Sequence, residues 1–467
     1  MQRYAIRMFA DGWRQWAPAI GLVAVMATMI GLCVYQFAWT TTTEFRDAVA
    51  KTDVPLAEFQ IISITIYTLV ALVAWVALTV VGQASVHATR HTHALWLLLG
   101  ASPRSVFGST LYVLLLVSLC GAAAGAAIAT VLSFWAIPAF NSAVSSEVVL
   151  PRFTLSPWAP AAIVAVSVVT MILGSILPAR RASRIEPSVA LRMPNQPGSN
   201  LKSTLVRVFT GVFFLAVAVV LVAVAKSDSE LASTGPGPIF NAAVTAGGSA
   251  LIAVYLLCPE IVGIVFRVLH RLFAASNLVV AALGTRAAAA RAQLNTTTIA
   301  PLAVGLGGVG LLLCTVRSVG AFIEILEPGV PANLSDVLII VAVVIVSMLA
   351  TSAAVVALSS RGRGREIALL QVCGLREQQV LSLVAAESFA MALAASTTAI
   401  IPVVVGGLVC AFASAASPVG SAVVVWPAGI MILGFLGSWL LMFLILVLPT
   451  ITPLRDGPSA QLREQVN

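Results

Sequence analysis

Charged residues are scarce in this sequence. Only 9% of its 467 residues are charged, against about 25% in an average soluble domain, while 60% are hydrophobic. A water-soluble globule could not cover its surface with 26 basic and 18 acidic residues. Intrinsic disorder is excluded as well, because disordered chains combine low hydrophobicity with high charge. The composition therefore predicts a membrane protein that crosses the bilayer many times.

Two kinds of site are also missing. The sequence has no GxxxxGK[S/T] segment, so we expect no phosphate-binding loop and no ATP hydrolysis in this chain. All six cysteines lie in or beside long apolar runs, which predicts small buried thiols and no disulfide framework. His87, His91 and His93 are spaced for one helical face, but no cysteine or acid lies nearby, so we predict no metal site.

Ten apolar runs are long enough to cross a hydrocarbon core of about 30 Å as helices. They lie at 17–39, 59–82, 107–136, 158–179, 205–225, 239–266, 299–322, 336–358, 381–413 and 424–448. The runs are continuous, whereas the strands of a membrane barrel alternate between apolar and polar residues. The predicted fold is therefore an all-α polytopic membrane protein with about ten transmembrane helices.

The basic residues predict the orientation. With the amino terminus assigned to the cytoplasm, 21 of the 26 Lys and Arg fall on the cytoplasmic side. The remaining five lie on or towards the other side: Arg46, Lys51, Arg152, Lys226 and Arg317. This positive-inside bias predicts a multi-pass protein of the cell membrane with both termini in the cytoplasm. The net charge of +8 is explained by topology and lipid contact, so nucleic acid is not an expected partner.

Two segment pairs indicate an internal repeat. Ser85–Val106 aligns with Ser359–Val380 at a constant offset, which pairs Gly100 with Gly374, and Leu177–Arg192 aligns with Leu448–Arg463. Both copies begin on the cytoplasmic side, so they are parallel and related by an axis along the membrane normal. We therefore divide the chain into a four-helix module at 1–200, a central helix pair at 201–285 and a second four-helix module at 286–467.

The segment that follows Arg361 is a basic turn leading into an amphipathic stretch that Gly374 ends as a helix cap. Its pattern alone fits two roles. A short helix of this kind docks in a partner's groove, or it lies on lipid headgroups.

The quoted segments resemble a known family. RGREIALLQVCGLREQQVLSLVAAES at 363–388 and LPARRASRIEPSVALR at 177–192 are similar to characteristic segments of FtsX-like permeases, the membrane subunits of MacB-type and BceB-type ABC transporters. The resemblance implies a non-catalytic permease that works with a separate ATPase. ATP and Mg²⁺ would bind to that ATPase, and this chain would hold no cofactor of its own.

The resemblance also implies where the ATPase binds. It assigns coupling to one segment in each half, and two segments imply two ATPase copies per permease chain. The residues concerned are Arg365, Glu366, Leu369, Leu370 and Gly374 in the second half and Ala94, Leu95 and Gly100 in the first. Thr92 stands where the second half has Glu366, so the two docking sites are expected to be unequal.

The external loops depart from the family pattern. Members usually carry a large external domain, whereas the loops here, 40–58 and 323–335, are too short to fold a core alone. A periplasm-spanning pump is therefore not expected. The predicted function is export or extraction of an amphiphilic or hydrophobic substrate, such as a peptide, lipid or antibiotic, from the membrane.

Several charged residues in or near the spans have two interpretations. Arg317 either reaches outward to Glu324 or Glu327, or lines a substrate path with them. Glu260 in the sixth span is interpreted as an interfacial structural residue, and Glu387 as the partner of a nearby base.

Two other functions remain open. A signalling permease would transmit ATPase cycling to a membrane partner such as a sensor kinase without transport. An ion-coupled secondary transporter should carry paired acids near the midplane, and the sequence shows no such pair.

Overall fold

The computed structural model describes residues 6–7, 9–10, 13–51, 56–89, 95–144, 151–183, 201–227, 236–276, 279–290, 292–326, 345, 371, 374–417 and 420–463. Within these residues the regular structure is helical throughout, with no strand. The helices are α2 (Trp13–Thr40), α3 (Thr43–Val49), α4 (Leu56–Ala88), α6 (Pro103–Val144), α7 (Ala159–Ser183), α9 (Leu201–Ser227), α11 (Pro236–Ala275), α12 (Val279–Ala290), α13 (Ala292–Leu326), α16 (Glu377–Ala416) and α17 (Ala428–Arg463).

Eight of these helices are long and apolar enough to cross a membrane: α2, α6, α7, α9, α11, α13, α16 and α17. Each coincides with one of the ten predicted spans. The predicted span at 59–82 falls within α4, and Val70–Val86 is its apolar stretch among the residues whose side chains are described. The predicted span at 336–358 lies outside the described residues. The protein is therefore a multi-pass helical membrane protein.

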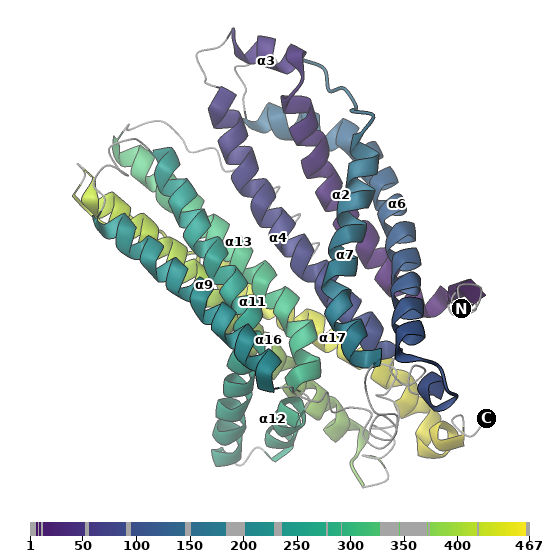
Figure 1. The fold of residues 1–467 in the computed structure, drawn as a ribbon. Helices are drawn as coiled ribbons and strands as arrows, with labels where there is room; N and C mark the ends of the chain where they lie inside the picture. The colour runs from purple at the N-terminus through teal and green to yellow at the C-terminus, as the bar shows by residue number, and fades with distance from the viewer. Residues whose placement is uncertain are drawn as a thin grey trace.

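The long helices run up and down in two groups (Figure 1). One group contains α2, α4, α6 and α7, and the other contains α9, α11, α13, α16 and α17; α4 packs against α11 and α13 and joins them. The start of α2 and the end of α17 lie in the lower half of Figure 1, whereas α3 lies at the upper end. The start of α2 and the end of α17 therefore lie towards the same end of the bundle.

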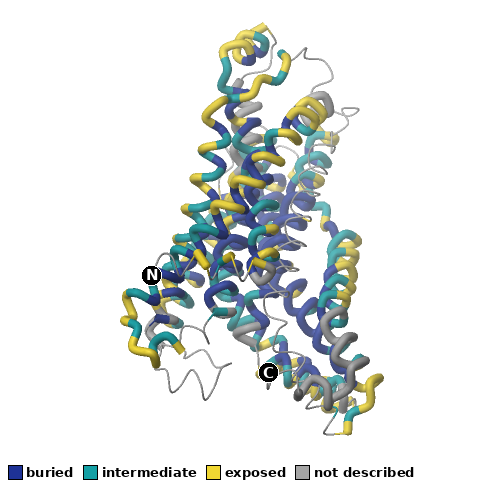
Figure 2. The backbone as a smooth tube through the Cα atoms, turned by 90° about the vertical axis from the view of Figure 1, so that its right-hand side faces the viewer, coloured by how far each residue is buried: buried dark blue, intermediate teal, exposed yellow. Residues whose placement is uncertain are grey.

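Buried residues concentrate where the helices face one another, and exposed residues lie on the outer sides (Figure 2). In lipid, helix association depends on van der Waals packing, since the tails are as apolar as the side chains. Small residues therefore bring backbones together. A Cβ added at Gly125 of α6 would lie 2.4 Å from the carbonyl oxygen of Ala24 in α2, and one at Gly174 of α7 would lie 2.4 Å from Cγ2 of Thr79 in α4.

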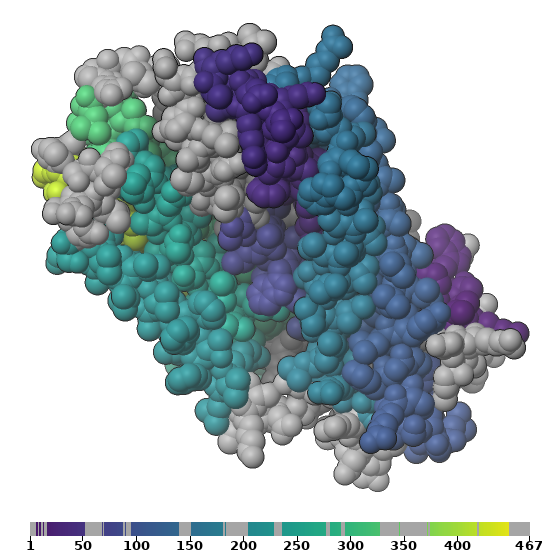
Figure 3. All heavy atoms as spheres, turned by 45° about the horizontal axis from the view of Figure 1, so that its top comes forward, coloured from purple at the N-terminus to yellow at the C-terminus, as the bar shows by residue number. Residues whose placement is uncertain are grey.

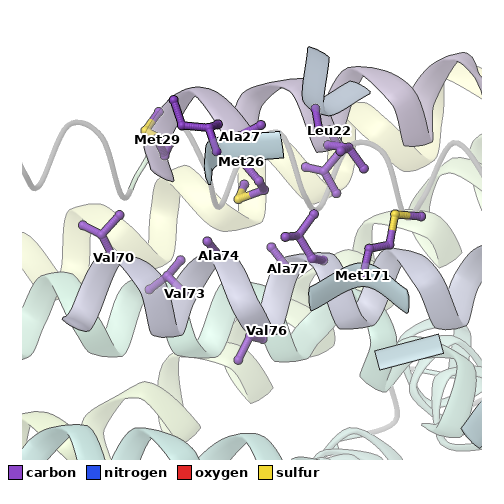
Figure 4. Close-up of a cluster of buried hydrophobic side chains, with 14 of the residues drawn as sticks. Leu22, Met26, Ala27, Met29, Val70, Val73, Ala74, Val76, Ala77 and Met171 are labelled. Atoms are coloured by element: carbon purple, nitrogen blue, oxygen red, sulfur yellow. The ribbon is translucent and has the colours of Figure 1, made fainter. Parts of the chain in front are cut away.

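The four helices of the first group share one core. Leu22 and Met26 of α2 lie next to Val73 and Ala77 of α4, with Met171 of α7 beside them (Figure 4). The core continues across the group boundary, because Leu251 of α11 and several α13 residues belong to the same cluster. The two groups are therefore packed together by apolar contacts.

The spans differ in how far they are buried. In α13, 94% of the most apolar window is buried inside the protein, against 17% in α9 and α17. Figure 3 shows α9 and α11 in teal along one side of the molecule and α6 and α7 in blue along the other, with α4 between them. Helices α9 and α17 thus present mostly lipid-type surface, while α13 is a central helix.

The boundary predicted between residues 285 and 286 lies inside α12 (Val279–Ala290). This short helix packs against α11 and α16. The Nδ1 atom of His270 in α11 lies 3.1 Å from the carbonyl oxygen of Ala282 in α12. Helix α12 therefore connects the central pair to the second predicted module.

Candidate functional site

A glycine turn precedes α6 at the lower end of the bundle. Residues 95–98 form one helical turn, after which Gly100 adopts a φ of 86°. The N–H of Gly100 donates to the carbonyl of Leu97 at 3.1 Å, and that of Ala101 donates to the carbonyl of Trp96 at 2.9 Å. These two bonds make a Schellman cap, which needs a residue at positive φ and therefore favours glycine. The cap ends the short helix and turns the chain into α6.

The leucines of this turn are exposed. Leu95, Leu98 and Leu99 have exposed fractions of 42%, 55% and 85%. Leu99 is held by the hydrogen bond from its own N–H to the carbonyl of Leu95, at 3.0 Å, so the turn presents these side chains on an ordered backbone. An exposed apolar cluster beside a charged helix start, where Arg104 is also exposed, suits either partner docking or contact with lipid.

A matching turn precedes α16. Gly374 adopts a φ of 92°, and its N–H donates to the carbonyl of Gln371 at 2.9 Å. Helix α16 begins at Glu377 and α6 at Pro103, which is the same offset as that between Gly374 and Gly100. A Cβ at either glycine would meet no atom within 4 Å, so the positive φ, not crowding, accounts for glycine at both turns.

The comparisons with known proteins bear on the first of these turns. Residues 64–187 match the family model described as FtsX-like permease C-terminal. Because of this similarity we call residues 64–187 the FtsX-like domain. The match runs from α4 through the Gly100 turn to the predicted closing segment, which confirms the resemblance for the first half of the predicted repeat. A comparison with curated proteins gives no match.

The predicted coupling residues are only partly placed. In the FtsX-like domain, Leu95 and Gly100 lie at the exposed turn, whereas Ala94 lies outside the described residues. In the second half Gly374 is placed at its turn, and Arg365, Glu366, Leu369 and Leu370 lie outside the described residues. Leu98 and Leu99 were not among the predicted coupling residues. Their position directly before a capping glycine was a signal in the sequence that could have identified them.

The predicted substrate path has little support from contacts. Arg317 and Glu324 are both exposed on α13 and form no ion pair with each other. Glu327 lies outside the described residues, so the alternative pairing stays a prediction. Glu387 is 2% exposed within α16 and interacts with other groups of the protein.

The described residues contain no group of three or more metal-ligating side chains. His91 and His93 lie outside the described part of the chain. Five cysteines are described and all have free thiols: Cys33, Cys120, Cys258, Cys314 and Cys410.

An ion pair joins the two central helices and was missed by sequence reasoning. Nη2 of Arg207 in α9 donates to Oε1 of Glu260 in α11, and it is the one ion pair among the described residues. The two side chains are 37% and 33% exposed. Glu260 was expected to be structural, but its partner was not identified. The sequence did contain a signal for this pairing. Helices α9 and α11 are consecutive, and Arg207 and Glu260 each lie some 20 residues from the segment that connects them, so they are at a similar depth.

Proposed function

We propose that this protein is the permease subunit of an ATP-driven ABC transporter that exports or extracts an amphiphilic or hydrophobic substrate from the cell membrane. The observation that carries the proposal is the FtsX-like permease domain at 64–187, within a chain of eight long apolar helices. Within this domain, between α4 and α6, lies the exposed turn at Gly100. A polytopic chain with that domain has the parts that a membrane subunit needs.

The proposal includes a second, equivalent module formed by the second half of the chain. Three features at one offset support the duplication: the pairs Gly100 and Gly374, Val106 and Val380, and the starts of α6 and α16. Both valines are 1% exposed, and both glycines have positive φ. Unrelated segments would not be expected to share a glycine cap, a buried valine and a helix start in the same register.

ATP hydrolysis is assigned to a separate subunit, because the sequence lacks a phosphate-binding loop. The ATPase would dock at the two glycine turns, which begin α6 and α16. Force would then pass directly into two of the longest helices in the protein, of 42 and 40 residues. The positive-inside bias places these turns, and both termini, in the cytoplasm where ATP is available.

The substrate class follows from the external segments. Helix α3, with seven residues, is the regular structure between α2 and α4 in the described chain, and its Phe45 packs 5.0 Å from the ring of Trp39 in α2. This segment forms a cap on the bundle. A substrate that reaches the protein through the lipid, as an amphiphile does, fits such short external segments better than one captured by a large external domain.

The subunit ratio tests the proposal. Co-purification with the ATPase should give two ATPase copies per permease chain, because each half carries one docking turn. Native mass spectrometry of the detergent-solubilised complex measures this ratio. A stable complex of two permease chains with two ATPases would contradict the proposal, since each chain would then use only one of its turns.

A further inference from the structure

Five polar side chains from three helices lie together at the junction of the two helix groups. Arg207 of α9 pairs with Glu260 of α11, and the hydroxyl of Tyr255 in α11 lies 3.2 Å from Oγ1 of Thr79 in α4. Gln83 of α4 and Arg207 of α9 are both close enough to Tyr255 to interact with it electrostatically. We call these residues the junction cluster. Helix α4 belongs to the FtsX-like domain, whereas α9 and α11 are the central pair.

The cluster is not satisfied by its own contacts. Nε of Arg207 and Oε2 of Glu260 are shielded from solvent and have no hydrogen-bond partner among the described residues. Pro259 adds a further acceptor, because it has no N–H to donate to the carbonyl of Tyr255 four residues earlier. Unsatisfied polar groups within a membrane span are costly and are associated with function. In a purely structural ion pair, Nε of the arginine and the second carboxylate oxygen of the glutamate would also be expected to have hydrogen-bond partners.

The surroundings of the cluster are apolar and open to lipid. Trp75 lies one turn from Thr79 on α4, its ring centre is 5.7 Å from that of Tyr255, and it is 41% exposed. On α9, Val206 and Phe209 flank Arg207 and are 67% and 76% exposed. Figure 3 shows α4 at the surface between α7 and the α9–α11 pair. A molecule in the bilayer could therefore approach this junction from the side.

The depth of the cluster suits a lipid headgroup. Arg207 is six residues from the start of α9, or about 9 Å along the axis, and Gln83 is five residues from the end of α4, or about 8 Å. An amphipathic helix at a membrane surface buries its apolar face about 5–10 Å into the boundary between headgroups and acyl chains, which is a similar distance. Both distances are measured from the end of the bundle that carries the Gly100 turn.

The geometry points to the junction cluster as a binding site for the headgroup of a zwitterionic phospholipid, with phosphate on Arg207 and ammonium on Glu260. The inference rests on the proposed function, because it names the class of amphiphile that the permease would take. The hydroxyl of Tyr255 would donate to the same phosphate, while that of Thr79 continues to donate to the carbonyl of Val76 in its own helix. The acyl chains would lie against Trp75 and Phe209.

Charge balance selects the zwitterion. An anionic headgroup that replaced Glu260 as the partner of Arg207 would leave a carboxylate without a counter-charge in an apolar setting. A cationic amphiphile would leave the guanidinium unpaired in the same way. A headgroup with both charges satisfies both side chains, and removing one partner of a charged contact shielded from water leaves the other charge uncompensated.

Lipid titration of the full-length permease tests the inference without the ATPase. Native mass spectrometry in detergent would measure the binding of phosphatidylethanolamine, phosphatidylglycerol and diacylglycerol, with soluble glycerophosphoethanolamine as a headgroup without chains. Phosphatidylethanolamine should bind at least about tenfold more tightly than the others. The double substitution Arg207→Gln and Glu260→Gln should abolish this preference. Tyr255→Phe, which keeps the ion pair, should weaken binding about fivefold.

The matched control is Arg267→Gln. Arg267 is an exposed base on α11 whose Nε donates to the carbonyl of Gly263 in the same helix, so its loss should leave lipid preference unchanged. Unaltered preference in a double-Gln variant with parental thermal stability would overturn the inference and leave a structural ion pair. If that variant fails to fold, unaltered affinity in Tyr255→Phe overturns it instead. Equal affinity for phosphatidylglycerol would exclude the zwitterion. None of these outcomes alters the subunit ratio, which tests the proposed function separately.

Discussion

Leu99→Asp should weaken association with the ATPase subunit by about a hundredfold or more. Leu99 is 85% exposed at the Gly100 turn, so the substitution removes little packing from the permease itself. At a docked interface it would bury a carboxylate without a partner, which costs about 2–5 kcal/mol. The affinity of the purified permease for its ATPase, measured in detergent, checks this expectation.

The control places the same substitution at the other end of the bundle. Leu155 is 38% exposed and follows Phe153, whose ring lies 6.0 Å from that of Trp39 near α3. Leu155→Asp should leave ATPase affinity at the parental value. Leu370→Asp, in the second predicted module, should act like Leu99→Asp. If both the Leu99 and the Leu370 variants bind the ATPase with parental affinity, these segments do not dock the ATPase and instead lie on lipid headgroups.

Gly125→Leu should strongly destabilise the first helix group. Even its Cβ would lie 2.4 Å from the carbonyl oxygen of Ala24 and 2.6 Å from Cβ of Ala27, where backbone cannot move aside without separating α2 from α6. The change would also disturb the hydrogen bond from Thr28 to the carbonyl of Gly125. Overpacking of this kind costs about 3 kcal/mol or more.

Gly108→Leu on the same helix is the matched control. Gly108 is exposed, and a Cβ there would meet no atom within 4 Å. The thermal unfolding midpoint of the detergent-solubilised protein should drop sharply for the Gly125 variant and stay close to the parental value for the Gly108 variant. Equal midpoints for the two variants would mean that α2 and α6 do not pack through Gly125.

The positions of the helices could be predicted from the sequence, but their ends could not. The apolar run at 107–136 lies inside α6, which extends from Pro103 to Val144. The run at 424–448 begins four residues before α17, which starts at Ala428 and continues to Arg463. Hydropathy detects the part of a helix that lies in lipid. The backbone hydrogen bonds that extend a helix into water do not depend on apolar side chains.

The burial of individual spans was also beyond sequence reasoning. Helix α9 has the most apolar window of the eight spans but is among the least buried, whereas α13 is less apolar and almost wholly buried. In a membrane the outer helices contact lipid and can be uniformly apolar, while an inner helix packs through small and polar residues such as Gly307 and Thr315. In a water-soluble protein the more apolar helix is expected to be the more buried one. That expectation would place α9 inside and α13 outside, which is the reverse of what the structure shows.

The glycine turns and the ion pair show two levels of predictability. Gly100 and Gly374 were predicted as equivalent residues, and both adopt positive φ, because a capping glycine leaves a local signature in the sequence. The pairing of Arg207 with Glu260 depends on how two helices align over their full length. That alignment depends on how the two helices pack in three dimensions. The sequence therefore indicates only the approximate depth of Arg207 and Glu260 in the membrane, and not that they pair.

Site-specific photocrosslinking tests the central claim most directly. A photoreactive amino acid at Leu99, at Leu375 next to the second glycine turn, or at exposed Thr154 at the other end of the bundle would be incorporated into the full-length permease together with its ATPase. The account predicts ATPase crosslinks from Leu99 and from Leu375, and none from Thr154. Crosslinks from neither turn, or from Thr154 alone, would contradict it.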